Sequence, residues 1–71
     1  MKLRFTNHAK IRIAERRIKI SDIKLAVSSS NIKLSSFGGN MVATKKLEKS
    51  TIEVVYQKIK NEIIIITAYY L

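Results

Sequence analysis

Three side chains that can act on a phosphate group recur at a four-residue spacing near the start of the chain: His8, Arg12 and Arg16. In an α-helix, residues at this spacing lie one above another within an arc of about 80°. Arginine donates paired hydrogen bonds to phosphate, and histidine exchanges a proton near neutral pH. The spacing therefore fits RNA cleavage without a metal ion, in which histidine transfers a proton and the arginines stabilise the charged transition state.

The same three residues have a simpler structural interpretation. A single histidine early in a helix often neighbours the cap or packs as a polar residue, and Arg12 and Arg16 could pair with Glu15. Both interpretations follow from the spacing alone. The distinction depends on whether the three side chains share an open groove.

The charge balance favours a polyanionic partner. Fourteen Lys and Arg residues stand against five Asp and Glu, which gives a formal net charge of +9. Nucleic acid, an acidic protein or solvated lysines could each account for this excess. A membrane partner is disfavoured, because no segment pairs a basic face with a wide apolar face. We expect RNA as the partner, with contacts from five further cations: Arg4, Arg17, Lys33, Lys45 and Lys46.

The composition also argues against several classes of site. With one histidine and no cysteine, a His/Cys zinc cluster is excluded, and we expect neither a metal nor a cofactor. Gly38-Gly39 lacks the Lys-Ser/Thr pair that completes a phosphate-binding loop. No targeting segment is visible at the N-terminus, and the apolar run 63–66 is far too short to span a bilayer. We therefore expect a cytoplasmic protein.

The elements that must position these residues follow from periodicity and turn signals. We predict a short strand or an extended segment at 3–5, a helix at 7–17 capped by Thr6 or Asn7, and a second helix that Ser21 caps with Asp22 in its first turn. Strands follow at 32–35, 41–44, 51–56 and 62–70, the last buried on both faces, and a hairpin turns at Gly38-Gly39-Asn40. The predicted fold is an α+β two-layer sandwich, a single domain over 1–71. In it, two N-terminal helices pack on a three- to four-stranded antiparallel sheet.

The segment from Thr6 to Ile18 resembles the signature T-x-H-A-x-x-R-x-x-E-R-G-I, and 64–69 is similar to a closing V-V-T-x-Y strand. The chain thus resembles the small prokaryotic domain-of-unknown-function family numbered four-two-five-eight. The resemblance implies a RelE-like fold of the barnase/EndoU/colicin-type ribonuclease group, whose members often act as toxins paired with antitoxins. It departs at Arg17, where the family has glycine, a position that implies a helix end with positive φ.

Carried over residue by residue, the resemblance nominates a catalytic set: His8, Arg12, Arg16, Thr67 and Tyr69. The leading hypothesis is a metal-independent endoribonuclease, the toxin of a toxin–antitoxin pair, that acts on free or ribosome-associated RNA and binds an acidic antitoxin. In it, His8 is general acid or base, the arginines bind the scissile phosphate, and Thr67 or Tyr69 assists. The alternative is a non-catalytic module on the same fold that binds RNA or a protein partner. The oligomeric state stays open.

Overall fold

The computed structural model describes residues 2–29, 32–35 and 37–71, and it describes side chains outside 32–37. The described elements, in chain order, are β1 (Lys2–Phe5), α1 (Asn7–Arg16), α2 (Ile20–Ser29), β2 (Ile32–Ser35), the 3-10 turn η1 (Phe37–Gly39), β3 (Met41–Lys46), β4 (Thr51–Ile59) and β5 (Glu62–Tyr70).

The described strands form one mixed sheet of five strands in the order β1-β5-β4-β3-β2. Strands β2, β3, β4 and β5 pair with one another in antiparallel fashion. Strand β1 pairs with the other edge of β5 in parallel, from Lys2↔Glu62 to Phe5↔Ile65. The α+β class with two helices on a sheet is confirmed, and β2 to β5 are the predicted antiparallel strands, but the sheet is mixed because β1 adds a fifth, parallel strand. By joining the sheet, the N-terminal segment pairs with backbone groups of β5 that would otherwise lie unpaired on an outer edge.

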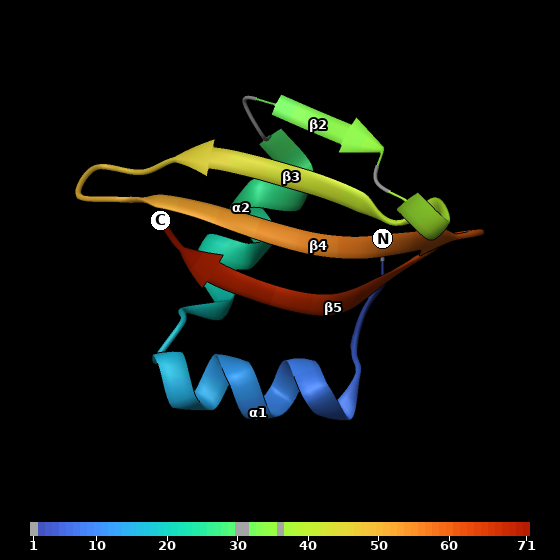
Figure 1. Cartoon of the computed structure of the whole chain (residues 1–71), viewed down its shortest axis with the longest axis horizontal. Coiled ribbons are helices and arrows are strands. Elements are labelled where there is room, and N and C mark those ends of the chain that lie inside the picture. The colour runs from blue at the N-terminus through green and yellow to red at the C-terminus, as the bar shows by residue number, and fades with distance from the viewer. Residues whose placement is uncertain (1, 30–31, 36) are drawn as a thin grey trace.

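The helices cover one face of the sheet and leave the other uncovered. In Figure 1, α2 passes behind β3 and β4, which it contacts, and α1 runs along the β5 side. Along β4, Ile52, Val54 and Tyr56 are buried, while the residues between them, such as Glu53 and Val55, are half-buried. We call the first set the covered face and the second the open face.

The prediction that β5 is buried on both faces is wrong. Ile63 and Ile65 are buried against the helices, but Ile64 and Ile66 are only half-buried, because no described element covers the open face. The near-continuous apolar run therefore consists of isoleucines buried on the covered face that alternate with half-buried isoleucines on the open face.

The ends of α1 follow local capping chemistry. The Thr6 hydroxyl accepts a hydrogen bond from the Ala9 amide at 3.0 Å, as an N-cap does. At the other end, Arg17 adopts φ 52° and ψ 45°, and the Ile18 amide donates to the Ile13 carbonyl at 3.0 Å. This is a Schellman motif, in which the buried residues Ile18 and Ile13 occupy the two positions of the hydrophobic contact. The positive φ at Arg17 is therefore confirmed.

The second helix starts two residues earlier than its cap signal predicts. It begins at Ile20, and the Lys19 carbonyl accepts from the amides of Asp22 and Ile23, so Ser21 lies inside the first turn and does not cap it. Asp22 does lie in the first turn, where its charge suits the helix dipole. The β2–β3 hairpin is confirmed, with φ of 85° at Gly38 and 82° at Gly39.

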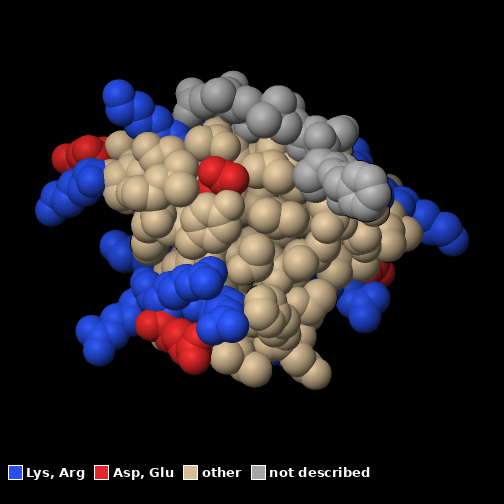
Figure 2. All heavy atoms as spheres, in the orientation of Figure 1, with Lys and Arg blue, Asp and Glu red and all other residues tan. Residues whose placement is uncertain are grey.

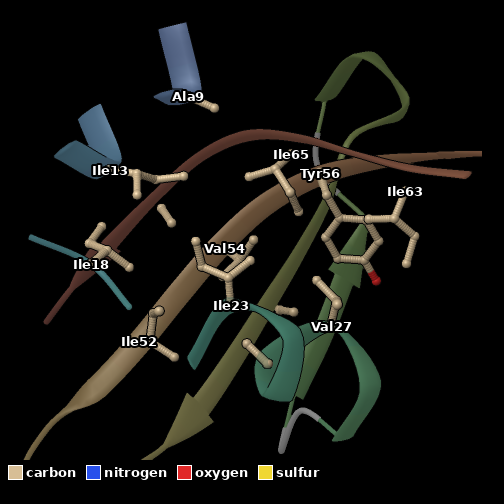
Figure 3. Packing of buried hydrophobic residues seen from close by; sticks show 13 residues of the cluster. Ala9, Ile13, Ile18, Ile23, Val27, Ile52, Val54, Tyr56, Ile63 and Ile65 are labelled. Carbon is tan, nitrogen blue, oxygen red and sulfur yellow. The ribbon is translucent and has the colours of Figure 1, made fainter. Parts of the chain in front are cut away.

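The hydrophobic core lies between the helices and the covered face. Figure 3 shows Ile23 and Val27 of α2 beside the residues of β4 and β5, with Ile13 and Ile18 closing the end nearest α1. The α1 helix contributes only Ala9 and Ile13 to this core among its described residues. Its remaining faces are therefore available for a site.

Candidate functional site

A one-residue bulge in β5 decides which side chains reach the open face. Val55 pairs with Thr67, but Tyr56 pairs with Ile65, which leaves Ile66 without a partner on β4. Because successive side chains alternate between faces, a regular strand with Ile65 on the covered face would place Thr67 and Tyr69 there as well. The bulge reverses that alternation, so Ala68 is buried and Thr67 and Tyr69 lie on the open face.

Arg16 reaches from the last turn of α1 to this part of β5. Its Nη1 donates to the Ala68 carbonyl at 2.9 Å and lies 3.4 Å from the Thr67 hydroxyl. Its guanidinium carbon lies 5.9 Å from the centre of the Tyr69 ring, within cation–π range. The structure therefore brings together three of the five predicted catalytic residues. The described hydrogen bonds of Arg16 all use Nη1, so the Nε and Nη2 donors are left for a ligand.

A carboxylate that the sequence patterns did not identify completes this group. The Tyr69 hydroxyl donates to Glu53 Oε1 at 2.9 Å, and Glu53 stands opposite Tyr69 in the β4–β5 register. Partial burial, and then the hydrogen bond and charge of Glu53, raise the pKa of Tyr69 above its ordinary value, although Arg16 opposes this. Tyr69 is consequently neutral at physiological pH, and its hydroxyl is a donor. Only the strand register could have revealed Glu53.

The other two members of the predicted set lie on the same side of α1 but are not joined to Arg16. Arg12 Nη1 pairs with Glu15 Oε1 at 3.0 Å, and both side chains are about half exposed. His8 is exposed and makes no hydrogen bond or ion pair with the described residues. The helical rise separates His8 from Arg16 by about 12 Å, with Arg12 midway.

The four predicted RNA-binding cations whose side chains the structure describes come from separate elements. Arg4 pairs with Glu62 at 3.2 Å on the β1–β5 edge, and Arg17 is exposed at the end of α1. Lys45 and Lys46 alternate between the two faces of β3, and the side chain of Lys33 lies outside the described part. Figure 2, which looks onto the open face, shows basic side chains around its rim, an acidic one near its middle, and a basic group over the C-terminal half of α1.

The described residues offer neither a metal site nor a membrane span. No three His, Cys, Asp or Glu side chains among them are grouped so that they could hold a metal ion. None of their helices is long and apolar enough to cross a membrane.

Two helices on one face of a mixed sheet form an α+β fold that is found in a solved ribonuclease toxin. The crystal structure of the Brucella abortus ribonuclease toxin BrnT matches with a TM-score of 0.74 at 13% identity, over 100% of this chain and 96% of that chain. The profile described as "Domain of unknown function (DUF4258)" matches residues 5–70. The chain therefore belongs to the DUF4258 family, as its signature indicated. A comparison with curated proteins gives no match.

Proposed function

We propose that this chain is a metal-independent endoribonuclease that acts in the cytoplasm as the toxin of a toxin–antitoxin pair. The observation that carries the proposal is the seating of Arg16 against Ala68 and Thr67, beside the Tyr69 ring, on a sheet face without a covering element among the described residues. An arginine held in this way presents its remaining donors to a phosphate in a fixed orientation. The fold shared with a ribonuclease toxin supports the same class.

In this mechanism the scissile phosphate binds between Arg12 and Arg16, one helical turn apart. Arg12 must first leave Glu15, and an ion pair this exposed contributes no more than about 1 kcal/mol. Arg16 keeps its Nη1 bond to Ala68 and offers Nε and Nη2, while the Thr67 hydroxyl donates to a phosphate oxygen. The Tyr69 ring supplies a surface on which a base can stack.

His8 lies one turn from Arg12, about 6 Å along the helix axis, on the side of Arg12 away from Arg16, where it faces the ribose next to the bound phosphate. It takes the proton of the ribose 2′-hydroxyl or gives a proton to the departing 5′-oxygen, and solvent water makes the other of these two proton transfers. The bond from the 2′-oxygen to phosphorus forms as the bond to the 5′-oxygen breaks. The products are a 2′,3′-cyclic phosphate and a free 5′-hydroxyl.

The test uses labelled single-stranded RNA in the presence of EDTA, with purified wild-type, His8→Ala and Lys10→Ala proteins. Lys10 is the matched control, because it is an exposed residue on the same helix but on the opposite side. We expect His8→Ala to lower the cleavage rate at least about a hundredfold, and Lys10→Ala to leave it unchanged. Circular dichroism checks that both variants fold. Wild-type activity in folded His8→Ala would falsify this role of His8.

The second candidate function is a non-catalytic module that binds RNA or an acidic antitoxin. The observation in its favour is that no described residue hydrogen-bonds to His8, whereas catalytic histidines are usually oriented by a second group. Under this alternative the wild-type protein binds RNA without producing fragments. Arginine substitutions then reduce affinity and lower its salt dependence by about 0.7 log unit for each phosphate that the protein no longer neutralises.

A further inference from the structure

A hollow of about 490 Å³ at the start of β5 is lined by Lys2, Lys58, Lys60 and Asn61. Three segments that are separate in the sequence meet there. Lys2 opens β1, Lys58 lies near the end of β4, and Lys60 and Asn61 form the turn into β5. The parallel pairing of β1 places Lys2 beside this turn, and the Lys2 amide donates to the Asn61 carbonyl at 3.2 Å. We call this site the lysine hollow.

The lysine hollow gathers three lysines beside one carboxylate, Glu62, which already pairs with Arg4. None of its lining residues is acidic, and the nearby Glu62 is occupied by Arg4 at 3.2 Å. All three lysines are exposed, and none forms an ion pair with the described residues. Three ammonium groups around one hollow repel one another, and an anion bound among them would relieve that repulsion.

The backbone conformation of Lys60 is a second indication that this turn binds an anion. It adopts a φ of 55°, one of two positive-φ residues other than glycine in the described chain, and the other is Arg17. The Cβ atom of a non-glycine residue makes this backbone region strained. Both strained positions therefore hold a cation where glycine would be more stable.

The lysine hollow and the Arg16 site lie at opposite ends of β5. Seven residues separate Glu62 from Tyr69, a distance of about 24 Å along the strand. Arg4, in register with Ile64, lies between the two ends. Stacked nucleotides rise about 3.4 Å each and an extended strand about twice that, so about four to seven nucleotides would bridge the two sites.

We propose, on the basis of the ribonuclease function above, that the lysine hollow binds a backbone phosphate of single-stranded RNA about four to seven nucleotides from the phosphate held at Arg16. RNA lying along β5 then contacts Tyr69 and Arg16 at one end and the lysines at the other. A short oligonucleotide reaches one of the two sites, and a longer one reaches both.

The test measures binding of 2′-O-methyl oligouridylates of about three and about twelve nucleotides by fluorescence anisotropy in EDTA, over a range of salt concentrations. These probes lack the 2′-hydroxyl nucleophile, so the wild-type protein cannot cleave them by the proposed mechanism. The test variant is Lys2→Gln/Lys58→Gln/Lys60→Gln. The matched control, Lys10→Gln/Lys24→Gln/Lys49→Gln, removes three exposed lysines elsewhere and so the same charge.

We expect the test variant to bind the longer probe about tenfold more weakly and to lower its salt slope by about 0.7 per phosphate released. Its affinity for the short probe should change less than about twofold, and the control should retain most of its affinity for the longer probe. Equal losses in the two triple variants, or equal losses for the two probes, would overturn the proposal. Lys60→Gly is a second variant that removes one ammonium group and relieves the positive φ, so its fold is not at risk.

This experiment separates the two proposals. If the lysine hollow binds the longer probe as expected but the protein never cleaves RNA, the ribonuclease function fails and the binding site stands. If the protein cleaves RNA and the test variant binds the longer probe normally, only the lysine hollow is refuted.

Discussion

Two adjacent tyrosines near the end of β5 have opposite roles, because they lie on opposite faces. Tyr69 is on the open face, bonded to Glu53 and beside Arg16. Tyr70 is on the covered face, where its hydroxyl donates to Asp22 at 2.8 Å and accepts from the Lys19 amide at 3.2 Å. Tyr70 thus fixes the α1–α2 connection to the sheet, whereas Tyr69 belongs to the candidate site.

Substitution of each tyrosine should separate stability from binding. We expect Tyr70→Phe to lower the free energy of unfolding by about 1 kcal/mol, since two hydrogen bonds are removed, with RNA affinity unchanged. Tyr69→Ala should weaken binding of the 2′-O-methyl probe by about tenfold, the loss expected for one stacked base. Urea unfolding and anisotropy measure the two effects. A loss of affinity in Tyr70→Phe, or none in Tyr69→Ala, would contradict these assignments.

The raised pKa of both tyrosines fixes the direction of any pH effect. Burial is the main cause for each, with the hydrogen bond and charge of the partner carboxylate adding to it. Their protonated forms are favoured in the folded state, so this stabilisation is complete below the ordinary tyrosine pKa of about 10 and is lost as pH rises through the higher folded values. Around neutral pH, therefore, Tyr69 cannot act as the general base.

At the scale of elements, the turn and cap chemistry could be predicted from sequence, and the strand register could not. Thr6 as N-cap and the hairpin at Gly38-Gly39 follow from local residue preferences, whereas the positive φ at Arg17 follows from the glycine of the family signature, and the predicted cap at Ser21 is wrong. The parallel pairing of β1 depends on a non-local partner, β5. The bulge at Ile66 likewise depends on how β4 and β5 align, and it determines both the face of Thr67 and Tyr69 and the meeting of Tyr69 with Glu53.

The C-terminal cap of α1 offers a test at this scale. Arg17→Gly removes the strain of a non-glycine residue at φ 52° but adds freedom to the unfolded chain. We expect a net gain of about 0.5–1 kcal/mol, which raises Tm by about 2–8 °C in a chain of this size. The control Arg17→Ala removes the same charge and keeps the strain, so its Tm should stay near wild type. A lower Tm for Arg17→Gly than for Arg17→Ala would refute the strain argument.

At the scale of the whole molecule, the net charge of +9 is not spread as one basic surface. On the face that Figure 2 shows, basic side chains lie around the rim, with a group over the end of α1, and the lysine hollow lies at the start of β5. The middle of the sheet instead carries half-buried uncharged residues and Glu53. The resulting arrangement favours an extended polyanion that meets cations at separated points rather than one that lies flat on a uniform patch.

The most direct test of the central claim is the chemistry of the fragment ends. Incubation of the wild-type chain with a single-stranded RNA in EDTA, followed by mass spectrometry, should reveal fragments that end in a 2′,3′-cyclic phosphate and begin with a 5′-hydroxyl. These ends follow from attack by the neighbouring 2′-hydroxyl at a phosphate held by Arg12 and Arg16 beside His8. Intact RNA after prolonged incubation, or fragments that begin with a 5′-phosphate, would contradict the account.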